Sequence, residues 1–144
     1  MFGMFKSKAR EARATMAKLE NKDLMEAIVA ASVLVAAADG DLEASELDKI
    51  DKLLKTNKQL NHFGSEITAT LNSFKEQFTE GGFRIIRQNA HRELEDIKHN
   101  PRDAETVVNI ILTVAEADGE IEDAEMKVLE DIASRLGLRI KDYL

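Results

Sequence analysis

The sequence predicts an all-α domain, and three observations support that prediction. Apolar residues recur at intervals of three and four along most of the chain, and no segment shows sustained alternation of apolar and polar residues. One proline, no tryptophan and one tyrosine are unlike the turn-rich, aromatic-rich composition of β-sandwiches. A chain of 144 residues has the size of one ordinary domain and can bury a core without disulfides. We therefore expect about seven helices, including two similar helical hairpins, packed as a bundle.

The first helices follow from the charge and the apolar spacing of the opening residues. Residues 1–20 form a basic amphipathic segment, which we separate from a helical domain over residues 21–144. Residues 24–35 and 47–54 carry the first two apolar stripes of that domain, on either side of a break at Gly40. The first stripe lies in a stretch that is almost wholly apolar, which is typical of a buried helix rather than a membrane span at this length.

Glycines and the single proline predict where the later helices begin and end. Ser65 is the expected N-cap of a helix that the adjacent glycines 81 and 82 should end. Pro101 suits the first position of a helix, because its fixed φ is helical and it has no N–H to lose there. Gly137 suits a left-handed C-terminal cap. The remaining apolar stripes follow from these boundaries and cover residues 67–78, 83–97, 107–115 and 126–136.

An internal repeat of acidic residues is the most informative feature of the sequence. Residues 35–51 match residues 114–130 at an offset of 79 positions. In each copy an Asp-Gly pair separates two helical stripes, so the repeat predicts two related hairpins with acidic bends. Five acidic positions coincide in kind: Asp39 with Asp118, Asp41 with Glu120, Glu43 with Glu122, Glu46 with Glu125, and Asp51 with Glu130.

Two interpretations of the acidic bends remain open. Each bend matches the second half of an EF-hand, but the first ligand positions fall on Val35 and Ala37 in one copy and on Val114 and Glu116 in the other, which excludes two complete EF-hands. If the bends meet, a shared Ca²⁺, Mg²⁺ or Mn²⁺ ion would offset the repulsion between their carboxylates. Alternatively, Asp-Gly stops one helix and the glutamates cap the next, without any metal.

The doubled motif resembles the TerB family of tellurite-resistance proteins. The resemblance rests on Ala-Asp-Gly-Asp-Leu-Glu-x-x-Glu from Ala38, its echo Ala-Asp-Gly-Glu-Ile-Glu-x-x-Glu from Ala117, and the closing residues 136–138. It implies an all-helical fold with two similar halves, an acidic metal-binding cluster, and a role in stress-response or phage-resistance assemblies near the inner membrane. The metal ligands that it implies are Asp39, Glu46, Asp118 and Glu125, with Asp41, Glu43, Glu120 and Glu122 as outer partners.

Composition and motifs exclude several other functions. Without cysteine the chain cannot form a disulfide scaffold, a cysteine zinc finger, an iron–sulfur site or a thiol nucleophile. No serine or threonine lies in a nucleophile motif, and no glycine-rich loop is present to hold a phosphate. The net charge of −7 argues against nucleic acid as a partner. We expect a non-enzymatic sensor or adaptor of a tellurite-resistance or stress-response system, bacterial or phage, that binds a divalent cation and unidentified protein partners.

The basic N-terminal segment supports a different function, a metal-free scaffold for a protein or a membrane. Residues 1–19 carry five basic side chains and one acidic one, a charge of +4 in an acidic chain. Residues 1–18 are therefore a candidate contact with an anionic membrane, which would bring a cytoplasmic protein to the inner face of that membrane. The other interpretation is that this segment packs on the acidic body of its own chain. Its apolar residues lie at helical spacing: Phe2, Phe5, Ala9, Ala12 and Met16.

Overall fold

The described part of the chain consists of α-helices and two short 3-10 helices, without β-strands. The computed structural model describes the backbone of residues 2–117 and 119–144, and the side chains of residues 9–12, 21–117 and 119–144. In chain order the elements are α1 Phe2–Ala36, α2 Ala44–Lys55, η1 Asn61–Phe63, α3 Gly64–Ile97, α4 Pro101–Glu116, α5 Asp123–Arg135 and η2 Ile140–Asp142. The predicted all-α bundle is confirmed.

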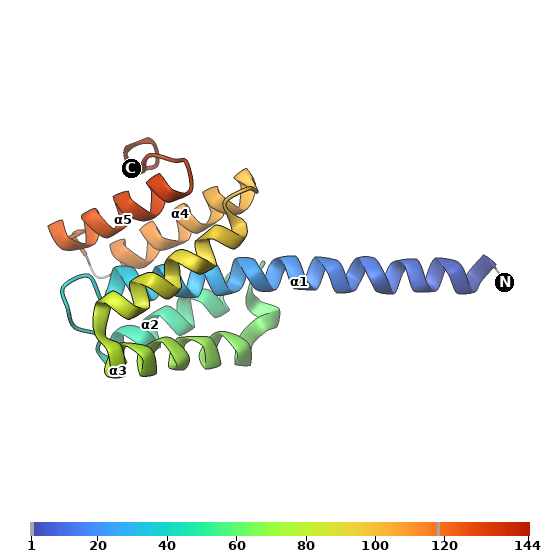
Figure 1. The fold of residues 1–144 in the computed structure, drawn as a ribbon, viewed down its shortest axis with the longest axis horizontal. Helices are drawn as coiled ribbons and strands as arrows, with labels where there is room; N and C mark the ends of the chain where they lie inside the picture. The colour runs from blue at the N-terminus through green and yellow to red at the C-terminus, as the bar shows by residue number, and fades with distance from the viewer. Residues whose placement is uncertain (1, 118) are drawn as a thin grey trace.

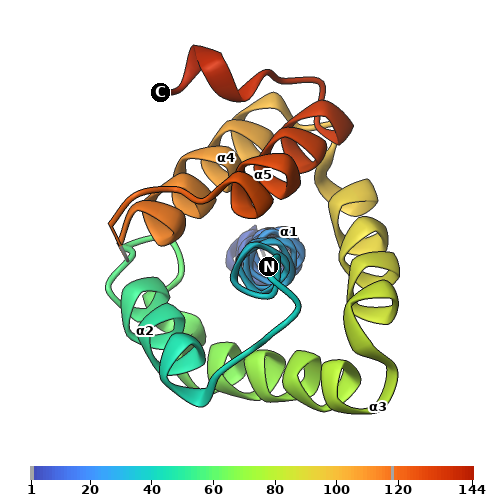
Figure 2. The same ribbon diagram turned by 90° about the vertical axis from the view of Figure 1, so that its left-hand side faces the viewer.

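Helix α1 is the axis of the bundle. Figure 2 shows the other four α-helices arranged as a ring around it, and α1 contacts each of them. No residue from 27 to 35 is more than 1% exposed, although these residues point to every side of the helix. A helix that is apolar all round must be covered all round, and the ring supplies that cover. Ser32 is the one polar residue within this fully buried stretch.

The first half of α1 projects from the ring as a single helix (Figure 1). Helix α1 runs without interruption from Phe2 to Ala36, across the change in charge near residue 20. The interpretation that this segment packs back on the body is therefore wrong for the backbone of residues 2–18, which extends away from it. Of the apolar residues predicted for the amphipathic face of this segment, Ala9 and Ala12 are exposed, and the side chains of Phe2, Phe5 and Met16 lie outside the described ones. We call residues 2–20 of α1 the arm.

Helix α3 bends sharply at Gly82. This glycine has φ 73° and ψ −170°, so the two parts of α3, residues 64–81 and 83–97, run in different directions along two sides of α1 (Figure 2). We call them the first and second limbs of α3. The paired glycines were predicted to end a helix, and the structure instead has a kink there, after which α3 continues. Together with the uninterrupted α1, this explains why the described residues contain five α-helices rather than about seven.

The predicted ends of the other helices are mostly correct. The side chain of Asn100 accepts hydrogen bonds from the backbone N–H groups of Arg102 (3.1 Å) and Asp103 (3.2 Å), with Pro101 at the first helical position of α4. Gly137 has φ 76° directly after the end of α5. Ser65 is not an N-cap, because η1 leads straight into α3 at Gly64. No helix in the described residues is long and apolar enough to cross a membrane.

Candidate metal centre

The first acidic bend, between α1 and α2, is held by its own side chains. The carboxylate of Asp39 accepts a hydrogen bond from the N–H of Asp41 at 3.0 Å, and the carboxylate of Asp41 accepts one from the N–H of Leu42 at 2.9 Å. Gly40 has φ 89°, a conformation that costs glycine little. Leu42 is buried and fixes the bend to the core. This bend can therefore form without a metal ion.

The second acidic bend, between α4 and α5, is held mainly by a helix cap. The Oε1 atom of Glu125 accepts a hydrogen bond from the N–H of Glu122 at 3.1 Å, so the capping interpretation is confirmed here. At the first bend Glu43 corresponds to Glu122, and its side chain makes no capping bond. The Oε2 atom of Glu43 instead accepts a hydrogen bond from the Ser45 hydroxyl at 3.5 Å. The two bends share a sequence pattern, while the capping box at the start of α5 is not found at the start of α2.

The two bends come together around one hollow of about 260 Å³. One wall is formed by the end of α1, the first bend and the start of α2; the opposite wall is formed by the second bend and the start of α5. The residues that line it are Ala36, Asp39, Glu43, Ser45, Glu46, Lys49, Glu120, Glu122 and Glu125. Six carboxylates and one ammonium group give this acidic hollow a formal charge of −5.

Glu46 and Glu125 separate the acidic hollow from the apolar interior. Both side chains are half-buried, and both also line a small cavity of about 30 Å³ beneath the hollow. The other walls of that cavity are mostly apolar and include Val35, Ile50 and Val114. Of the lining carboxylates these two therefore lie nearest the low-dielectric core, where an unbalanced charge is most costly.

Most of the predicted ligands lie at the acidic hollow. Asp39, Glu46 and Glu125 line it, whereas Asp118 lies outside the described residues. Of the predicted outer partners, Glu43, Glu120 and Glu122 also line the hollow and Asp41 does not; the carboxylate of Asp41 accepts a hydrogen bond from the backbone of its own bend. In residues 2–117 and 119–144 no three carboxylates already lie close enough together to hold a metal ion.

Lys49 is the residue at this site that the sequence interpretation missed. Its side chain lines both the acidic hollow and the small cavity, and brings the one positive charge among the lining residues. The sequence did contain a signal, because Lys49 follows Glu46 by three positions and residues three apart lie on the same face of a helix.

Comparison with known proteins identifies the family. The family model described as "Tellurite resistance protein TerB" matches residues 25–144. The chain belongs to the TerB family. The match begins at Met25, beside the first fully buried turn of α1, so the arm lies outside it. No curated protein and no solved structure matches the chain.

The side chains of this TerB domain have the chemistry that a hard divalent cation needs. All the candidate donors at the acidic hollow are carboxylate oxygens, and neither histidine nor cysteine lines it. Ca²⁺ and Mg²⁺ are bound by such oxygens, and Ca²⁺ tolerates irregular arrangements of six to eight of them. The donor type therefore fits, while the positions of the described carboxylates require side-chain rotation before three can reach one ion.

Proposed function

We propose that this TerB domain is a non-enzymatic module that binds one divalent cation in the acidic hollow and serves as a sensor or adaptor in a stress-response system. The observation behind the proposal is that carboxylates from both copies of the repeat line one space. Two carboxylates 4 Å apart repel by about 4 kcal/mol at an effective dielectric of 20, so a cation between the bends would be strongly favoured.

The position of the acidic hollow explains how an ion would act on the fold. The first bend joins α1 to α2, and the second joins α4 to α5. An ion coordinated by oxygens from both bends would link the α1–α2 hairpin to the α4–α5 hairpin at one end of the bundle. Without the ion, carboxylate repulsion would push the same two bends apart. A bundle whose end is closed by an ion and loosened without it has the properties of a sensor.

Thermal unfolding in the presence and absence of cations tests this function. The melting temperature should rise when Ca²⁺, Mg²⁺ or Mn²⁺ is added to EDTA-treated protein, because an ion at 100 times its Kd stabilises the fold by about 2.7 kcal/mol. The double substitution Glu46→Gln and Glu125→Gln should abolish the rise. The matched control, Glu66→Gln with Glu76→Gln, removes two exposed charges far along the chain from the hollow and should respond like the wild type. Identical melting curves with EDTA and with all three ions would contradict the proposal.

The arm favours a second function, contact with an anionic membrane by a metal-free scaffold. Removing the charge of +4 on residues 1–19 from the total of −7 leaves −11 on the remaining residues. As a helix, residues 2–20 span about 28 Å, several times the Debye length of about 8 Å at physiological ionic strength. The arm can therefore bring its basic residues to an anionic surface while most of the acidic body stays beyond electrostatic range.

Vesicle sedimentation tests the membrane contact. The full chain should sediment with vesicles that contain phosphatidylserine, and much less with vesicles of phosphatidylcholine alone, because each basic residue near an anionic surface contributes about 1 kcal/mol. Deleting residues 1–18 should abolish sedimentation with the vesicles. It should leave the thermal unfolding of the bundle, followed by circular dichroism, unchanged. Equal sedimentation of the truncated and full chains would exclude the arm as the membrane contact.

A further inference from the structure

Carboxylates of α1 and α3 face each other on the side of the bundle away from the repeat. Glu26 of α1 and Glu93 of the second limb of α3 are both half-buried, and a side-chain hydrogen bond to Glu26 is among the causes that raise the pKa of Glu93. Asp23 and Asp96 lie within electrostatic range of Glu93. Asp23 precedes Glu26 by three positions, and Asp96 follows Glu93 by three positions. Two carboxyl groups can share a hydrogen bond only when one of them keeps its proton, so the pair carries a single negative charge when closed.

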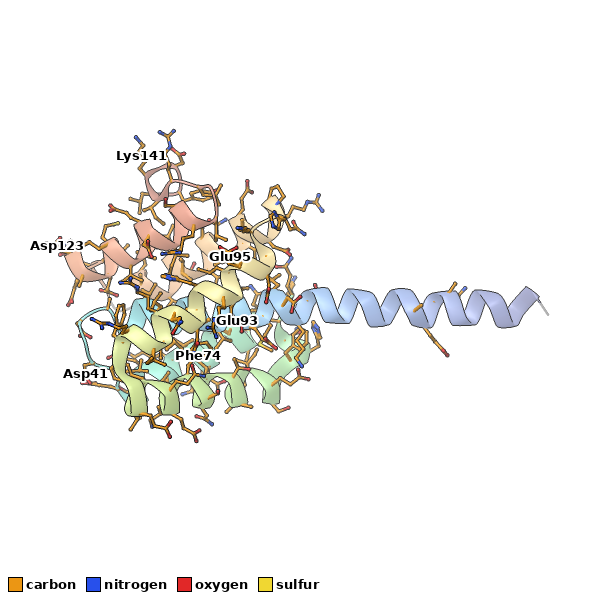
Figure 3. All side chains as sticks on the ribbon, viewed as in Figure 1. Asp41, Phe74, Glu93, Glu95, Asp123 and Lys141 are labelled. Atoms are coloured by element: carbon orange, nitrogen blue, oxygen red, sulfur yellow. The ribbon has the colours of Figure 1, made fainter. Side chains whose placement is uncertain are left out.

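This pair lies in the angle between α1 and the two limbs of α3. Glu26 and Glu93 both line a hollow of about 420 Å³, whose remaining walls come from both limbs of α3. Phe74 on the first limb and Glu93 on the second are labelled in Figure 3. A hydrogen bond of 2.6 Å from the Asn89 amide to the Gln77 oxygen joins the two limbs across the bend. The carboxyl pair thus adds a polar contact at this hollow between α1 and the second limb.

Burial raises the pKa of Glu93 to about 7, and the negative charges of Glu26, Asp96 and Asp23 act in the same direction. The only cationic side chain lining this hollow among the described residues is that of Arg92, and it is not enough to reverse the shift. The first limb contributes only uncharged side chains to the hollow: Ala69, Thr70, Ser73, Phe74 and Gln77.

We propose that the Glu26–Glu93 pair is a proton-dependent latch that fastens the second limb of α3 to α1. With the shared proton in place, the hydrogen bond joins the two helices beside the Gly82 bend. When the proton leaves, Glu93 and Glu26 repel each other, Asp23 and Asp96 add to that repulsion, and the limb loosens from α1. Opening would uncover the apolar face by which the limb packs on the core, at Ile86, Ala90, Leu94 and Ile97.

The direction of the pH effect follows from the raised pKa. Glu93 binds its proton more tightly in the closed limb than in an open or unfolded one, where its pKa is about 4.5. The stabilisation from the latch is complete at pH values below about 4.5 and is lost as the pH rises through about 7. A change from slightly acidic to slightly alkaline conditions therefore releases the limb.

Hydrogen exchange measured at pH 6 and pH 8 tests the latch. After correction for the intrinsic exchange rate, the opening equilibrium of peptides from residues 86–97 should increase by about three- to tenfold between these pH values, as the release of one proton allows. Glu93→Gln keeps a hydrogen-bonding side chain without a charge. In this variant the opening equilibrium of the same peptides should increase by less than about twofold between pH 6 and pH 8. Glu80→Gln, an exposed substitution on the first limb, should match the wild type. All samples contain EDTA, which separates this test from cation binding at the acidic hollow.

A titration of the wild-type protein completes the test and does not depend on any variant folding. The side-chain carboxyl carbon of Glu93, followed by NMR, should show a titration midpoint near 7. A midpoint below about 5.5, close to an ordinary glutamate, would overturn the proposal. So would exchange in residues 86–97 that rises equally with pH in the wild type and in Glu93→Gln.

Discussion

Glu46 of α2 and Glu125 of α5 lie 79 positions apart in the chain and line the same hollow. Each belongs to a different copy of the acidic repeat, and each also forms part of the wall of the small cavity beneath. The two matching acidic segments therefore line one shared space.

This shared space predicts the stoichiometry of cation binding. Isothermal titration with Mn²⁺ should give one ion for each chain, because both copies contribute to one hollow. Glu46→Gln alone and Glu125→Gln alone should each weaken binding at least tenfold, about 1.4 kcal/mol, rather than remove half of the sites. Two ions for each wild-type chain, or one ion retained at full affinity in a single variant, would show that the bends bind independently.

Gly82 should be harder to replace than Gly64, the first residue of α3. Gly82→Ala places a Cβ at φ 73°, and we expect a loss of about 1–3 kcal/mol in the free energy of unfolding, although nothing lies within 4 Å of the new atom. Gly64→Ala is the control, because Gly64 also has open space but lies at φ −34°; it should be neutral or stabilise by up to about 1 kcal/mol. Urea unfolding measures both, and equal effects would mean that backbone strain does not set the bend.

Ser32 predicts a stabilising substitution in the centre of the bundle. Its hydroxyl group is fully buried and has no hydrogen-bond partner. Ser32→Ala removes that group, so the free energy of unfolding should increase by about 1–2 kcal/mol. Ser32→Val should instead destabilise, because a larger side chain must fit where the ring already covers α1 closely. Chemical unfolding of the three proteins at one pH gives the comparison, and a loss of stability in Ser32→Ala would indicate that the hydroxyl is satisfied in solution.

His91 predicts a loss of stability in mild acid. Burial lowers the pKa of His91, and the charge of Arg135 lowers it further, while Asp131, whose Oδ2 atom lies 3.2 Å from Nε2, opposes the shift. Because the folded state disfavours the protonated ring, this stabilisation is present above about pH 6.5 and is lost as the pH falls through the lower folded value. The melting temperature of the wild type should therefore fall more steeply from pH 7 to pH 5 than that of His91→Gln.

His99→Gln is the control for that comparison, since His99 is exposed and lies outside the pair with Asp131. It should follow the wild-type curve across the same range. If His91→Gln also follows that curve, the protonation of His91 does not contribute to acid sensitivity.

Local patterns in the sequence were enough to predict the helices and several of their ends. The apolar stripes, the Asn100-Pro101 start of α4 and the interruption at the paired glycines all depend on neighbouring residues, and all are present. The prediction of Ser65 as an N-cap was wrong, because the preceding turn, η1, passes directly into α3 and leaves no separate capping position. The continuity of α1 also went unrecognised, because a change in charge at residue 20 does not interrupt a helix.

The contacts between distant segments were harder to predict. The repeat gave a reason to expect that the two acidic bends meet, and the lining of the hollow agrees with it. No comparable repeat connects Glu26 with Glu93, which are 67 positions apart and approach each other only because α3 bends back along α1. Pairings of this kind depend on helix packing angles, which a single sequence does not specify.

The central place of α1 has a consequence for how the protein is made. The ribosome completes α1 before it has synthesised any of the helices that cover it. The almost wholly apolar stretch of residues 27–35 therefore stays uncovered until those helices are made. Burial on every side is reached only after α5 has emerged, more than ninety residues later. Until then the nascent chain exposes the apolar surface of α1, which is prone to aggregate. Chaperones that cover such surfaces, or rapid translation of the remaining helices, would reduce that risk.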